Sequence, residues 1–116
     1  MKTVLLEAKD IGGELLNTDL IEDYPGSESV TGRELAEKMG AHAVKFGLKV
    51  QTYSPVKKIT SDGDWKVIVM DDGTTYRTYA VIVTVGGEPI KLGVPGEAEF
   101  YGRGVSYCAV CDGAFF

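Results

Sequence analysis

The sequence predicts an α/β domain that carries an inserted, three-stranded antiparallel β-meander. An apolar strand and a capped amphipathic helix occupy the first half of the chain, in the order found in α/β units. Short strands joined by Asp-Gly turns follow, and a continuous apolar run comes after them. The 116 residues suffice for one domain, and a chain of this size buries roughly two-thirds of its unfolded surface.

The first strand is expected at residues 2–7, where Val4 to Leu6 form an unbroken apolar run. A helix should begin at Thr31, because Glu34 follows it at the spacing of a capping box, and should end at Gly47. The residues predicted to form the buried face of this helix are Leu35, Met39, Ala43 and Phe46.

Alternating polar and apolar residues follow the helix and predict strands. One strand is expected at 49–53, and an antiparallel meander at 56–60, 65–70 and 75–79. The turns of the meander contain Asp-Gly pairs, in which Gly adopts a positive φ at little cost.

The apolar run at 80–85 is expected to be a buried, parallel strand, because strands covered on both faces are apolar throughout. The Gly- and Pro-rich stretch from 86 to 107 is expected to be a loop or linker. These features predict a partial domain over 1–96 and a linker with a cysteine segment over 97–116.

Composition and charge narrow the classes of partner. Twelve Lys and Arg against seventeen Asp and Glu give a net charge of −5, and the scattered basic residues argue against nucleic acid. No apolar run approaches the roughly 18 residues of a membrane span, and the first residues lack the pattern of a signal peptide. A cytoplasmic protein without a membrane partner is expected.

The chemistry is predicted at the only two cysteines, Cys108 and Cys111, which are separated by two residues. At the start of a helix, this spacing brings two sulfurs within bonding reach and favours a thiolate, which is the nucleophile of disulfide exchange. Asp112 follows directly and is positioned to serve as a general acid and base. A redox-active dithiol is the favoured interpretation.

A zinc site is the competing interpretation of the cysteine pair. Structural zinc takes four ligands, and His42 is the only obvious nitrogen donor in the chain. No metal site is therefore expected within one chain, although a site shared between two chains stays open.

Several segments together resemble the bacterial and archaeal thioredoxin reductases, of the FAD- and NAD(P)H-dependent pyridine nucleotide-disulfide oxidoreductase family. The cysteine segment is closely similar to the active-site segment of that family. The similar segments are 12–15 (GGEL), 22–26 (EDYPG), 82–86 (IVTVG), 92–96 (LGVPG) and 102–113 (GRGVSYCAVCDG). They occur in the order that the family has, from one end of the chain to the other.

The resemblance implies a partial FAD-binding Rossmann-like fold whose dithiol passes electrons from reduced FAD to a thioredoxin-like protein disulfide. Cys111 would face the flavin, Cys108 would attack the substrate disulfide, and Asp112 would donate the proton. The resemblance further implies FAD contacts by Glu7, Gly13, Glu14, Asp23, Val56 and Gly86. Glu14 and Asp23 place carboxylates where the family commonly has amides.

The resemblance also implies an internal fragment. The sequence lacks the family's first G-x-G-x-x-G turn, which holds the FAD pyrophosphate, and its NADPH domain. Weak or no activity is therefore expected from the chain alone, and a non-catalytic remnant without flavin is the alternative. An uncovered sheet edge would favour association into a homo-oligomer.

Overall fold

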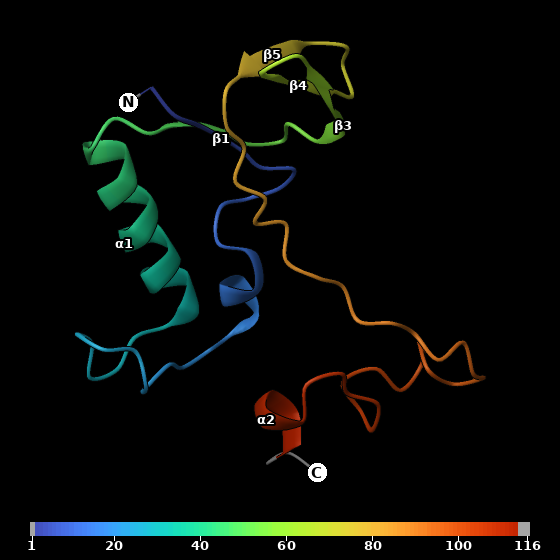
Figure 1. Ribbon diagram of the computed structural model, residues 1–116. Coiled ribbons are helices and arrows are strands. Elements are labelled where there is room, and N and C mark those ends of the chain that lie inside the picture. The colour runs from blue at the N-terminus through green and yellow to red at the C-terminus, as the bar shows by residue number, and fades with distance from the viewer. Residues whose placement is uncertain (1, 114–116) are drawn as a thin grey trace. The chain divides into compact units, whose positions relative to one another are not determined.

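The structure is a computed structural model that describes residues 2–113, with the side chains of Val110 and Cys111 outside the description. It divides into two compact units, Met1–Thr84 and Val85–Phe116 (Figure 1). The boundary predicted at residue 96 separates functions rather than compact units, and it stays a prediction.

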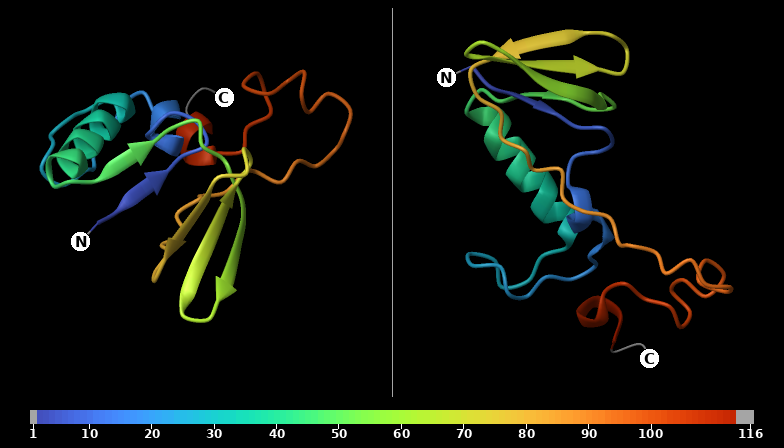
Figure 2. Two further views of the ribbon diagram at one scale, coloured as in Figure 1. Left: turned by 90° about the horizontal axis from the view of Figure 1, so that it is seen from above. Right: turned by 45° about the vertical axis from the view of Figure 1, so that its right-hand side comes forward.

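The first unit begins with a βαβ arrangement. Strand β1 (Val4–Leu6) pairs in parallel with β2 (Lys49–Gln51), and helix α1 (Gly32–Lys45) lies between them in the sequence. The two strands run side by side in both views of Figure 2. The predicted first strand, helix and second strand are confirmed, with strands shorter than expected.

Helix α1 begins as its sequence predicts. The Thr31 hydroxyl accepts the Glu34 N–H at 3.2 Å, and the Glu34 carboxylate accepts the Thr31 N–H at 3.1 Å. This reciprocal capping box satisfies two backbone donors that the first helical turn leaves unpaired. The helix ends at a C-cap on Phe46, and Gly47 follows with a φ of 90°.

The short 3-10 helix η1 (Gly13–Asn17) packs closely against the start of α1. Gly32 permits this contact, because a Cβ at this position would lie 1.9 Å from the Leu15 carbonyl oxygen. The Gly32 N–H in turn donates to the Thr18 carbonyl oxygen at 3.1 Å. The loop that follows β1 is thereby fixed against the helix.

The predicted meander is confirmed as an antiparallel sheet in the order β3-β4-β5 (Figure 1). Its strands are β3 (Val56–Asp62), β4 (Trp65–Met70) and β5 (Thr75–Thr78). Ile68 and Met70 on the central strand are 6% and 4% exposed and belong to the buried core. A hydrogen bond of 2.6 Å from the Tyr76 hydroxyl to Gln51 Oε1 connects the meander to β2.

Two expectations of burial are wrong. Leu35 is buried in α1 as predicted, but Met39 is 50% and Phe46 is 79% exposed, so the face that packs inward is narrower than the apolar pattern. Ala36 is buried instead, at 3% exposure, and packs beside Gly12. A Cβ added at Gly12 would lie 3.0 Å from the Ala36 methyl group. Close backbone packing favours a small side chain there.

The apolar run at 80–85 is not a strand in this structure, which contradicts the sequence prediction. Ile82 and Val85 are 87% and 89% exposed. A parallel strand needs a hydrogen-bonded neighbour and cover on both faces, and no strand among residues 2–113 pairs with this run. The expected loop over 86–107 does lack helices and strands, apart from a bridge between Tyr101 and Val105. Within residues 2–113, no helix is long and apolar enough to cross a membrane.

Candidate functional site

The cysteine segment enters a single helical turn. Helix α2 (Ala109–Asp112) begins directly after Cys108, whose carbonyl oxygen accepts the Asp112 N–H at 3.0 Å. Cys108 is half-buried and is a disulfide-bonded cysteine rather than a free thiol. The predicted role of the Cys111 sulfur lies outside the described residues, because only the backbone of Cys111 is described.

Ser106 connects the cysteine to the predicted proton donor. Its hydroxyl donates to Asp112 Oδ2 at 2.5 Å and accepts the Cys108 N–H at 3.0 Å. The same hydroxyl lies 3.2 Å from the Cys108 carbonyl oxygen, a second acceptor within reach. The backbone of Cys108 and the carboxylate of Asp112 are thus brought together through one side chain, and all three residues are half-buried.

A second polar cluster precedes the cysteine segment and is centred on Glu97, which is only 7% exposed. Its two carboxylate oxygens accept the N–H groups of Leu92, at 2.8 Å, and Gly93, at 2.7 Å. The hydroxyl of Tyr107 donates a short hydrogen bond to Glu97 Oε1. A buried carboxylate requires such partners, because an unpaired charge loses its hydration on burial.

The Glu97–Tyr107 contact shifts the pKa values of both side chains. The hydrogen bond from Tyr107, aided by the Leu92 and Gly93 N–H groups, lowers the pKa of Glu97 below its ordinary value. The same hydrogen bond, with burial and the charge of Glu97, raises the pKa of Tyr107 to about 12. Glu97 is therefore ionised and Tyr107 protonated near neutral pH.

The predicted nucleotide-contacting residues at the end of β1 lie on one connected stretch of chain. Glu7 follows β1 directly, is half-buried, and its Oε1 accepts the Lys9 N–H at 2.9 Å. The backbone of Glu7 bonds to Gln51 and Ser54, at 2.9 Å each, which fixes it beside the end of β2. This is the carboxyl end of the parallel strands, where ligands bind in open α/β sheets.

Gly13 opens η1 with a φ of 52°, and nothing lies within 4 Å of the position of a Cβ. Glu14 is exposed, and its Oε2 accepts from Asn17 Nδ2 at 3.2 Å. No hydrogen bond among residues 2–113 joins Glu7 to either residue. Their shared role in holding one ligand stays a prediction.

The remaining predicted contacts are dispersed. Asp23 is exposed in the loop between Ile21 and Val30, which form an isolated antiparallel bridge. Val56 begins β3 and is 41% exposed. Gly86 has a φ of 68°, a conformation that favours glycine, and belongs to the second unit.

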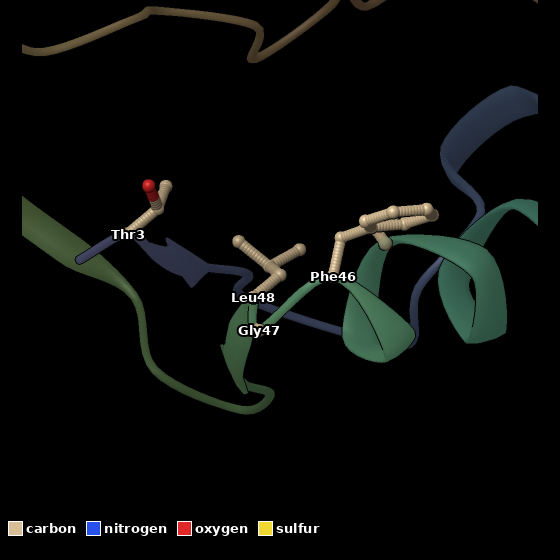
Figure 3. A pocket seen from close by; sticks show the side chains of 5 residues that line it. Thr3, Phe46, Gly47 and Leu48 are labelled. Carbon is tan, nitrogen blue, oxygen red and sulfur yellow. The ribbon is translucent and has the colours of Figure 1, made fainter. Parts of the chain in front are cut away.

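A pocket of the first unit lies elsewhere, at the end of α1 (Figure 3). Its lining residues are Thr3, Ala43, Phe46, Gly47 and Leu48. None of these residues belongs to the predicted site, and the pocket offers no titratable side chain for chemistry. In the part of the chain that the structure describes, no three His, Cys, Asp or Glu side chains cluster as metal ligands.

Comparison with known proteins identifies the family. The sequence profile of the family described as "Pyridine nucleotide-disulphide oxidoreductase" matches residues 1–115. The chain belongs to this family. It is 47% identical over 116 residues to the thioredoxin reductase of Bacillus subtilis and 41% identical to that of Listeria monocytogenes. It matches the crystal structure of Lactococcus lactis thioredoxin reductase with a TM-score of 0.80 and 45% identity.

The relatives in this pyridine nucleotide-disulphide oxidoreductase family are longer. The match covers 100% of this chain and 36% of each of the two curated relatives, and 38% of the Lactococcus lactis chain. The predicted α/β class with its antiparallel meander is confirmed by this match as well as by the strands. The activity, substrates and partners of the longer proteins are matters of proposal for this chain.

Two features of the described residues bear on the predicted flavin site, which stays a prediction. The Glu7 carboxylate lies at the carboxyl end of β1, where it can accept hydrogen bonds from ribose hydroxyls. The open space at Gly13 leaves room for a ligand to approach the backbone closely. The chain between β1 and α1 contains the five-residue η1.

Sequence reasoning missed Ser106, Glu97 and Tyr107. Each lies inside or beside a segment that resembles the family, but their importance follows from hydrogen bonds that no spacing rule predicts. One sequence signal could have indicated Glu97: it directly follows the Pro95-Gly96 pair, between two segments that resemble the family.

Proposed function

We propose that this chain is the dithiol segment of a thioredoxin-reductase-type oxidoreductase, which passes electrons from reduced FAD to a protein disulfide. The observation that supports the proposal is the Cys-x-x-Cys pair, with Cys108 directly before α2 and Cys111 within it, and with Asp112 held beside Cys108 by Ser106. The relatives that share this segment are thioredoxin reductases, so a thioredoxin-like protein is the proposed substrate.

The exchange step begins with the reduced pair. The Cys108 thiolate attacks the substrate disulfide, forms a mixed disulfide and releases one substrate thiolate, which takes a proton from Asp112. The Cys111 thiol then gives its proton to the Asp112 carboxylate and attacks the Cys108 sulfur, which closes the Cys108–Cys111 disulfide. The second substrate thiolate is released and takes that proton from Asp112. Two electrons leave the dithiol and two thiols form on the substrate.

Bound FAD would supply the two electrons that reopen the disulfide. We assign its contacts to Glu7 at the ribose, Gly13 and Glu14 at the flavin end, and Asp23 at the isoalloxazine edge. Val56 would contact the adenine, and Gly86 would allow close passage of the backbone. Support comes from the carboxylate at the carboxyl end of β1 and from the open space at Gly13.

NADPH is the proposed electron source in the complete proteins of this type. This chain covers 36% of the curated relatives, so we expect little flavin uptake and little NADPH-dependent turnover from it alone. A cytoplasmic location and self-association through the exposed 80–85 run are further parts of the proposal. Their support is the cysteine usage and the exposure of Ile82.

A non-catalytic remnant is the second candidate. The high exposure of Ile82, Val85 and other members of the apolar run favours it, because an enzyme in its working assembly covers such surface. This candidate predicts colourless protein whose thiols neither form a disulfide nor exchange with a partner.

The decisive experiment uses the chain and two matched variants, Cys108→Ser and Cys111→Ser. Flavin absorbance and thiol content are measured before and after dithiothreitol, and each variant is mixed with oxidised thioredoxin. The proposal expects a reducible disulfide in the unmodified chain and a trapped mixed disulfide with Cys111→Ser but not with Cys108→Ser. Colourless protein with no reducible disulfide, or equal trapping by both variants, would favour the remnant.

A further inference from the structure

Glu97 is the one buried charged side chain among residues 2–113. Its carboxylate joins distant parts of the second unit, because it accepts hydrogen bonds from Leu92 and Gly93 before it in the chain and from Tyr107 after it. Tyr107 is covalently bonded to Cys108. The carboxylate therefore anchors the residue next to the cysteine pair.

The stretch between these contacts is itself closed by backbone hydrogen bonds. The Phe100 N–H donates to the Gly96 carbonyl oxygen at 2.8 Å, and the Val105 N–H donates to the Phe100 carbonyl oxygen at 3.0 Å. Glu97 lies inside this turn, so its carboxylate connects a backbone turn on one side to the Tyr107 ring on the other. Tyr107 also lies near Tyr101, with ring centroids 5.7 Å apart.

We propose that Glu97 is a positioning residue that fixes Tyr107, and through it the Cys108 end of the dithiol, and so stabilises the disulfide form of the pair. This inference rests on the proposed dithiol function. The physical reason is entropic: a backbone already held in place loses less freedom when the two sulfurs join.

The contact is also electrostatically matched. An ionised carboxylate strengthens a hydrogen bond from a phenol, and the burial of Glu97 limits competition from water. On the residue before Tyr107, the Ser106 hydroxyl accepts a hydrogen bond from the Cys108 N–H at 3.0 Å. Two independent anchors thus flank the peptide bond that leads into Cys108.

The test compares Glu97→Gln and Tyr107→Phe with their double variant and with Glu99→Gln. Glutamine keeps one acceptor oxygen but loses the charge and the oxygen that accepts the Gly93 N–H, and phenylalanine removes only the hydroxyl. Glu99 is an exposed acid two residues away and is the matched control. Each protein is equilibrated with oxidised and reduced dithiothreitol, quenched with acid, alkylated and weighed by mass spectrometry.

We expect Glu97→Gln and Tyr107→Phe each to shift the midpoint about three- to tenfold toward the dithiol, the size that one typical intramolecular hydrogen bond contributes. The double variant should shift by less than the sum of the two single variants, because both changes act on the same contact. Glu99→Gln should match the unmodified chain. Midpoints of Glu97→Gln and Tyr107→Phe equal to that of Glu99→Gln would overturn the inference.

A second readout separates this inference from the proposed function. In a Cys111→Ser background, the rate at which iodoacetamide alkylates Cys108 is measured with and without Glu97→Gln and Tyr107→Phe. Loss of the anchor should raise this rate about threefold or more, since half-buried Cys108 would gain freedom. If the unmodified pair never forms a disulfide, the proposed function fails. The alkylation rate of Cys108 then decides by itself whether Glu97 and Tyr107 hold this residue in place.

If Glu97→Gln disturbs the fold, shown by altered circular dichroism, Tyr107→Phe decides, because it leaves every backbone hydrogen bond of Glu97 in place.

Discussion

The Ser106 hydroxyl donates to the Asp112 carboxylate at 2.5 Å while it accepts the N–H of Cys108. One small side chain therefore couples the position of the predicted proton donor to the backbone of the predicted nucleophile. Both residues belong to a segment that is held locally, within seven residues of the chain, as the sequence span from Ser106 to Asp112 shows.

Replacement of the proton donor should slow thiol–disulfide exchange. We expect Asp112→Asn to lower the rate at which the reduced chain reacts with oxidised glutathione about 100-fold, because the leaving thiolate loses its acid. Ser106→Ala should lower the rate about tenfold, since it frees the carboxylate without removing it. The rate is followed by acid quenching and mass spectrometry. Asp64→Asn, in the exposed turn before β4, is the control, and a similar rate for Asp112→Asn would contradict the assigned role.

Alkaline titration should reveal the Glu97–Tyr107 contact. The pKa of Tyr107 should be about 12, above the ordinary tyrosine value of 10.0, because its hydroxyl donates a hydrogen bond to ionised Glu97. Since the folded pKa is raised, the associated stabilisation is complete below pH 10 and is lost as the pH rises toward 12. The ultraviolet absorbance of tyrosinate measures the titration. The last of the six tyrosines should titrate earlier in Glu97→Gln but not in Tyr24→Phe, where a tyrosine remote in sequence from Glu97 is missing.

The capping box of α1 should contribute measurably to stability. Thr31→Ala should lower the free energy of unfolding by about 1 kcal/mol, whereas Thr31→Ser should retain most of it because its hydroxyl still accepts the Glu34 N–H. Thermal or urea unfolding followed by circular dichroism gives the comparison. An equal loss of unfolding free energy in both variants would show that the Thr31 hydroxyl does not stabilise the helix.

The same box predicts a pH dependence. Hydrogen bonds from Thr31 lower the pKa of Glu34 below its ordinary value of 4.5. Because the folded pKa is depressed, the stabilisation by Glu34 is present above pH 4.5 and is lost as the pH falls through the folded value. The difference in melting temperature between the unmodified chain and Glu34→Gln should therefore shrink on acidification, and a constant difference would exclude this cause.

Two glycines of the same helix should respond in opposite directions to alanine. Gly32→Ala should destabilise the fold by about 2–3 kcal/mol, because its Cβ would lie 1.9 Å from the Leu15 carbonyl oxygen. Gly40→Ala should stabilise it by up to about 1 kcal/mol, since its Cβ would lie at an ordinary 3.8 Å from Ile11 and alanine favours helix. Urea unfolding of both variants checks the pair, and similar effects would mean that η1 does not pack tightly on α1.

Local patterns predicted most elements correctly. The capping box at Thr31 and the Asp-Gly turns act within a few residues, so the start of α1 and the meander follow from them. The apolar pattern failed where burial depends on distant partners. Met39 and Ile82 are apolar but exposed, because periodicity states which side chains can be buried and not what covers them.

The sequence by itself determined the α/β class, the meander, and the single helical turn that follows Cys108 and contains Cys111 and Asp112, since each depends on contacts between near neighbours. Only the tertiary structure decided that Glu97 is buried against Tyr107 and that Gly32 packs on η1. Those relationships join residues through space, where the free energy depends on geometry and desolvation rather than on local preference.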